Sequence, residues 1–141
     1  MKFDPAVAAQ TSLRRAREAG ELGEDLDRAM EAEEIFSAEV GEPARAAYET
    51  LQEIGDRHPE ATFFQEYLIY LTWQQVMAEP IPMYFRKGAE LCDHYLNQSG
   101  DRHDETQGRQ IHELRASFRA GLGLGSNEPE IYEDDTVKGG D

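Results

Sequence analysis

The side chains with the most reactive chemistry are four histidines and one cysteine: His58, His94, His103, His112 and Cys92. A zinc site needs three or four such ligands to converge, and the sequence has neither an HExxH nor a CxxC motif. Glu90 and His94 are four residues apart and would share a helix face, but the Glu-x-x-His pairs of di-iron bundles are absent. We therefore expect structural or solvated histidines, no metal and no cofactor.

Cys92 is a poor candidate for a nucleophile. His94 is two residues away, so the two side chains would diverge on a helix. A single thiol also cannot form an internal disulfide, so we expect Cys92 to be a small buried apolar residue. Without a catalytic motif the sequence favours a protein that is not an enzyme. A small enzyme whose site forms only in three dimensions is the remaining alternative.

The charge of the chain limits its partners. Among 141 residues 30% are charged, and the net charge is −15. Such a chain is repelled by nucleic-acid phosphates and by anionic lipids, so we expect no direct nucleic-acid binding and no membrane binding. The charge favours a basic partner. The N-terminal residues lack the apolar core of a signal peptide, and no stretch approaches the roughly 20 apolar residues of a membrane helix, so we expect a cytoplasmic protein.

The local sequence signals are mainly those of helices, and these helices must position the candidate residues. Proline at helix starts, glycine at helix ends and apolar residues at three- and four-residue steps predict an all-α fold of five to six antiparallel helices. The predicted helices cover residues 5–19, 24–40, 43–55, 60–78, 82–97 and 104–120. We expect three regions: a peripheral N-terminal helix in 1–22, a helical domain in 23–125, and a disordered acidic tail in 126–141.

The predicted helix 60–78 is the most apolar. Its aromatic and aliphatic residues, among them Phe64, Tyr67 and Leu71, surround it on nearly every side, which predicts a central position in the core. The chain has more tyrosine and tryptophan residues than a core needs. Each has a polar group that needs a hydrogen-bond partner when it is buried. Such residues are favoured in interfaces. We therefore name Tyr70, Trp73 and Tyr84 as candidate partner-binding residues.

The predicted helix 24–40 is unusually acidic. Leu26, Met30, Ile35 and Phe36 are expected on its apolar stripe. The other side carries a run of carboxylates, and either a solvated surface or a docking surface for a basic partner would explain it. The candidate partner-binding residues on this side are Glu31, Glu33 and Glu34.

Two segments have similar patterns of small and large residues. Ala44, Tyr48 and Leu51 follow one Pro-containing turn, and Ile81, Phe85 and Gly88 follow another. This pattern resembles the second helix of a tetratricopeptide repeat, with Tyr48 and Phe85 separated by 37 residues where the family has 34. The resemblance covers about residues 25–97 and implies a helical array that binds a peptide or a helix in a groove. An ordinary helical bundle is the alternative.

Besides the small enzyme, two functions remain open from the sequence. The first is an adaptor, scaffold or assembly factor that binds a protein partner, or a second copy of the same chain, through a helical groove. The second is an acidic inhibitor whose carboxylates imitate nucleic-acid phosphates and occupy a basic site on another protein. Salt should weaken the second kind of binding more steeply than the first.

Overall fold

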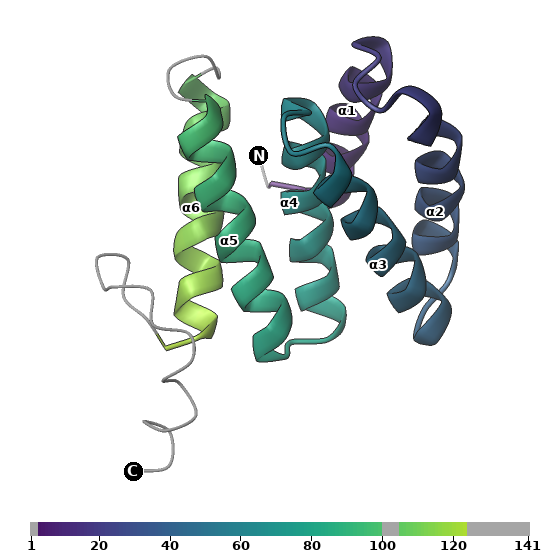
Figure 1. The fold of residues 1–141 in the computed structure, drawn as a ribbon. Coiled ribbons are helices and arrows are strands. Elements are labelled where there is room, and N and C mark those ends of the chain that lie inside the picture. Colours follow the sequence, from purple (N-terminus) through teal and green to yellow (C-terminus); the bar gives the residue numbers. More distant parts are fainter. Residues whose placement is uncertain (1–2, 100–104, 124–141) are drawn as a thin grey trace.

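The computed structural model describes residues 3–99 and 105–123, which form six α-helices and a short 3-10 helix (Figure 1). The elements are α1 (Pro5–Glu18), η1 (Gly23–Asp25), α2 (Leu26–Ala38), α3 (Glu42–Arg57), α4 (Thr62–Ala78), α5 (Pro82–Ser99) and α6 (Glu105–Gly121). No strand occurs in these two ranges, and the predicted all-α class is confirmed. The tail predicted for 126–141 lies outside the described residues.

The helix boundaries follow from local chemistry. The carboxylate of Asp4 caps α1 by accepting a 3.0 Å hydrogen bond from the backbone N–H of Ala6, and Pro5 fits the first turn because it has no N–H to satisfy. A positive φ of 72° at Gly41 turns the chain sharply between α2 and α3. Of the predicted stops, Gly55 instead lies inside α3, where it leaves room for the Leu68 side chain.

Helix α4 lies at the centre of the core, as its sequence predicts. Phe64, Tyr67, Leu68 and Leu71 are buried, and α4 packs against α1, α3 and α5 (Figure 1). Its own N-cap, Ala61, offers no side-chain hydrogen bond. Glu21 supplies the missing cap by accepting hydrogen bonds of 3.1 and 3.0 Å from the backbone N–H groups of Phe63 and Phe64. The turn after α1 is thereby tied to the start of α4.

Helix α1 belongs to the core rather than to its periphery. It packs along α4, and its Ala9, Leu13 and Ala16 are buried. The sequence suggested a peripheral position because α1 has few large apolar residues. The structure compensates with alanines, whose small side chains let the two helices approach closely.

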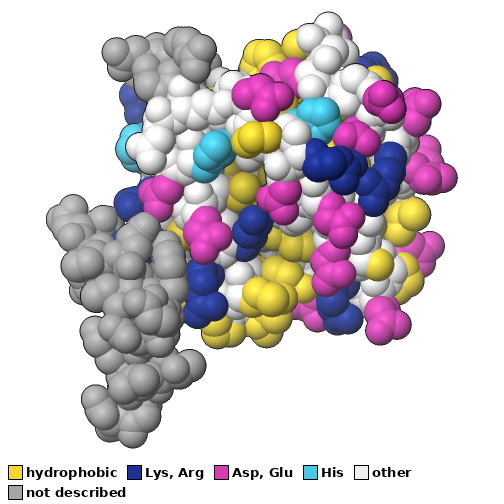
Figure 2. All heavy atoms as spheres, viewed as in Figure 1, with side chains coloured by type: hydrophobic (Ala, Val, Ile, Leu, Met, Phe, Trp, Pro, Cys, Tyr) yellow, Lys and Arg dark blue, Asp and Glu magenta, His cyan; other side chains and the backbone are white. Residues whose placement is uncertain are grey.

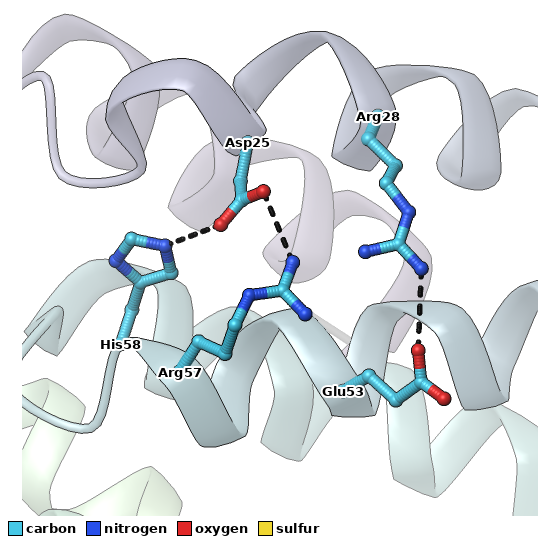
Figure 3. Close-up of polar contacts among 5 residues, drawn as sticks. All are labelled: Asp25, Arg28, Glu53, Arg57 and His58. Atoms are coloured by element: carbon cyan, nitrogen blue, oxygen red, sulfur yellow. Dashed lines mark hydrogen bonds and ion pairs between the residues drawn. The ribbon is translucent and has the colours of Figure 1, made fainter.

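Helices α2 and α3 form a hairpin that is joined by ion pairs at its surface. Asp25 accepts hydrogen bonds from Arg57 (3.0 Å) and His58 (2.7 Å), and Arg28 pairs with Glu53 at 3.2 Å (Figure 3). The contact with His58, followed by that with Arg57, holds the pKa of Asp25 below its usual range. Part of the acidic charge of this region is thus neutralised inside the fold.

Helices α5 and α6 pack through a glycine contact. A Cβ atom on Gly88 would lie 2.2 Å from the Phe118 ring, so only glycine lets that ring lie against α5. The Phe118 ring also packs edge-on against Trp73 of α4, with 5.3 Å between ring centroids. The contact therefore brings α4, α5 and α6 together.

Candidate functional site

The reactive side chains are dispersed rather than collected in one place. His58 binds Asp25, the Nε2 atom of His94 lies 2.9 Å from the backbone oxygen of Pro59, and His112 is exposed. Cys92 is fully buried, as expected, and burial raises the pKa of its thiol. Within 3–99 and 105–123 no three His, Cys, Asp or Glu side chains are grouped to hold a metal ion. His103 lies outside the described residues.

A fully buried carboxylate, Glu66, is the most unusual polar group of the core. It accepts hydrogen bonds from Ser12 (2.6 Å), Tyr95 (2.8 Å) and Gln107 (2.6 Å), which come from α1, α5 and α6. Burial is the main cause that raises its pKa, and the hydrogen bonds from Ser12 and Tyr95 oppose that rise. The carboxylate accepts hydrogen bonds from three donors, so Glu66 has the arrangement of a structural residue that joins four helices.

The aromatic candidates for partner binding are mostly enclosed by the fold. Tyr70 is buried and donates a 2.9 Å hydrogen bond to Gln110. Tyr84 is also buried, with its ring edge-on to Tyr48 at 5.4 Å. Trp73 is half-buried against Phe118. These residues fill the spaces between helices and do not line a common surface.

The three acidic candidates separate into exposed and buried groups. Glu31 and Glu34 are exposed, whereas Glu33 is buried and accepts hydrogen bonds from Tyr67, Gln10 and Ser37. Steps of four and three residues from Leu26 through Met30 lead to Glu33, so the inward stripe of α2 passes through this carboxylate. Ile35, which was expected on the stripe, is exposed instead. The expectation that Glu31, Glu33 and Glu34 share one acidic surface is therefore wrong, because Glu33 lies inside the fold.

The structure forms a groove that the sequence did not indicate. It lies between the end of α2, the start of α3 and the end of α4, and it has a volume of about 460 Å³. We call it the turn groove. Its lining residues are Phe36, Glu39, Val40, Gly41, Ala44, Gln74, Gln75, Ala78 and Glu79.

One side of the turn groove is held rigidly by a charged network. Arg45 donates to both carboxylate oxygens of Glu79, from Nη2 at 2.6 Å and from Nε at 3.2 Å, and Gln75 adds a 2.7 Å hydrogen bond. The hydrogen bonds from Arg45 lower the pKa of Glu79. The nearby Tyr84 hydroxyl also raises the pKa of Arg45 and lowers that of Glu79, as smaller contributions than the direct contact between the two side chains. A fixed carboxylate at the edge of a groove can orient a bound group.

Exposed apolar side chains occur in the groove lining and in the neighbouring segments of the sequence. Val40 follows α2 and is 86% exposed, and Met77 in the last turn of α4 is 65% exposed. Ile81 and Met83, at the α4–α5 turn, are exposed as well. Hydrophobic side chains gather at the lower edge of the view in Figure 2, where Figure 1 has the α4–α5 turn. An apolar patch on so charged a protein is typical of a surface that another molecule covers.

Comparison of the chain with protein-family models, with curated proteins and with solved structures finds no match in any of the three. The class defined by the fold is an all-α helical protein. Within the described residues, no helix is both long and apolar enough to cross a membrane.

Proposed function

We propose that the chain is a non-enzymatic protein-interaction module, an adaptor or assembly factor, and that it binds a segment of a partner protein in the turn groove. The supporting observation is the combination of a 460 Å³ groove with exposed apolar residues, Val40 and Met77, on a protein of net charge −15. Burial of such residues by a partner supplies the main driving force for association. Tyr70 and Tyr84 support the helices from inside, and the groove residues make the contact.

The tetratricopeptide resemblance supports the choice of the turn groove in this proposal. Ala44 is the first residue of the pattern that carries the resemblance, and it lines the turn groove. In a repeat-like reading α2 and α3 form the first unit and α4 and α5 the second. The groove then lies where two units meet, which is a natural place for a bound segment.

A photo-crosslinker placed at Ala78 tests this proposal. Ala78 is exposed and lines the groove, whereas Ala120 is exposed on α6 and serves as the control position. We expect a crosslinked partner from Ala78 and not from Ala120. The partner, once purified, should bind the wild type and lose binding to Ala78→Arg. Equal binding of the purified partner to both proteins would show that the groove is not the site.

The acidic-inhibitor alternative is supported by the exposed carboxylates of α2. Glu31 and Glu34 are both exposed and would face a basic site together. Neutralising both to glutamine should abolish binding by an inhibitor of this kind, and added salt should weaken it steeply. A partner that is insensitive to Ala78→Arg and sensitive to Glu31→Gln with Glu34→Gln would select this alternative.

A further inference from the structure

The ends of two helices meet at the turn groove. Helices α2 and α4 both direct their C-terminal turns to it, at Phe36–Val40 and at Gln74–Glu79. The last carbonyl groups of a helix lack partners within the helix and carry a partial negative charge. Basic residues commonly offset that charge, yet neither helix has one in its last turn. The groove therefore presents two negative helix ends.

Of the two carboxylates that line the groove, Glu39 adds to this negative potential. Glu39 follows α2 directly and forms no ion pair with another residue in the described part of the chain. Glu79 is held by Arg45, which is the one cation at this edge that the structure places in an ion pair. The N-terminus of α3 also borders the groove, and its positive dipole is offset by Glu42 in its first turn.

Besides Gln74 and Gln75, the remaining side chains of the lining are apolar. Phe36, Ala44 and Ala78 provide carbon surface inside the groove, and Val40 lies at its edge. This combination suits a long side chain with an apolar stem and a cationic end. The stem would lie on the carbon surface, and the cation would reach the helix ends and Glu39.

We infer that the turn groove recognises a lysine or arginine side chain next to an aliphatic residue in a segment of a partner protein. This inference rests on the proposed function and names the chemistry of its partner. The net charge of −15 attracts any basic peptide from a distance. The groove adds a fixed place for one cation beside an apolar contact, so binding should depend on groove residues and not only on total charge.

Three synthetic peptides test the inference by fluorescence anisotropy at 0.15 M salt. All are 12 residues long and have leucine at the same positions, with lysine, glutamine or glutamate at the others. We expect the lysine peptide to bind the wild type. Ala78→Arg should weaken that binding about tenfold, whereas Ala120→Arg should change it less than about twofold. Both substitutions add the same charge in the last turn of a helix, so their comparison separates the groove from the overall field.

A second matched pair tests the carboxylate. Glu39→Gln should weaken binding of the lysine peptide by about two- to fivefold, the usual effect of an exposed ion pair, and Glu113→Gln on α6 should leave it unchanged. Circular dichroism of every variant shows that the helices remain. Equal effects of Ala78→Arg and Ala120→Arg, or no binding of the lysine peptide, would overturn the inference. The glutamine peptide could bind as tightly as the lysine peptide and be weakened in the same way by Ala78→Arg. That result would show that no cation is needed, so the inference would be wrong while the proposed function would stand.

Discussion

At the scale of single residues, the buried carboxylates connect the helices of this protein. Glu66 joins α4 to α1, α5 and α6, and Glu33 joins α2 to α1 and α4. A buried carboxylate is costly unless donors surround it. Each of these two groups accepts three hydrogen bonds from other side chains, so their contribution is to the specific arrangement of helices.

The raised pKa of Glu66 predicts a pH dependence of stability. A carboxyl whose pKa is higher in the folded protein than in the unfolded chain favours folding below the unfolded value, and that contribution is lost as the pH rises through the folded pKa. Glu66→Gln removes this titration. The unfolding free energy of Glu66→Gln minus that of the wild type should therefore increase from pH 4 to pH 7, measured by urea denaturation.

Glu113→Gln makes the same substitution at an exposed position and serves as the control. A flat difference for Glu66→Gln would mean that Glu66 does not titrate differently in the folded state. The larger truncation Glu66→Ala should reduce the free energy of unfolding by about 1–3 kcal/mol, because it leaves the Ser12, Tyr95 and Gln107 donors without their acceptor.

At the scale of helices, glycine contacts set how closely α5 and α6 approach. Gly88→Ala would place a methyl group 2.2 Å from the Phe118 ring, which also packs edge-on against Trp73. We expect the free energy of unfolding to fall by about 1–3 kcal/mol, despite the better helix propensity of alanine. Chemical denaturation monitored by circular dichroism measures this loss.

Gly55→Ala is the matched comparison for Gly88→Ala. The new methyl group would also meet a close atom, Leu68 Cδ1 at 2.3 Å, but that atom ends a flexible side chain that can rotate away. Gly55→Ala should therefore cost less than Gly88→Ala. Equal losses would show that the Phe118 ring moves as easily as the Leu68 methyl group.

Sequence reasoning recovers the helices and misses the contacts between distant ones. Proline and glycine positions and the apolar character of α4 are local signals, so helix bounds and the central position of α4 are predicted. The burial of Glu33 is not, because its donor Tyr67 is 34 residues away in the sequence. The turn groove combines residues 36–44 with 74–79, and no local pattern indicates that these two turns are neighbours.

The predicted tyrosine candidates illustrate the same difficulty. Tyrosine is favoured both in interfaces and in cores that offer its hydroxyl a partner. Gln110, on α6, provides that partner for Tyr70 from 40 residues away. Composition alone cannot distinguish the two settings, because the partner becomes visible only when the helices are packed.

At the scale of the whole molecule, net charge opposes the compact state. The described surface has some ion pairs, such as those of Asp25 and Glu53 in Figure 3, but a charge of −15 leaves many carboxylates that repel one another. Exposed pairs each contribute little, and salt screens attraction and repulsion alike. The repulsion should be the larger effect.

Added salt should therefore stabilise the protein. Raising sodium chloride from 10 to 150 mM should increase the melting temperature by about 2–4 °C, which corresponds to roughly 1 kcal/mol for a chain of this size. Differential scanning calorimetry measures the change. A decrease of the melting temperature with added salt would mean that the surface ion pairs outweigh the self-repulsion. The Glu53→Gln variant, which breaks the pair with Arg28, should then show a smaller decrease than the wild type.

The packing of α1 against α4 has a consequence for the synthesis of the protein on the ribosome. Residues 19–61 separate these two helices, so α1 leaves the ribosome well before the surface that it will cover has been synthesised. Until residues 62–78 emerge, Leu13 and its neighbours have no place to be buried. Helix α1 is thus synthesised before its packing partner α4, and the nascent chain must avoid aggregation in the meantime, which its net negative charge favours.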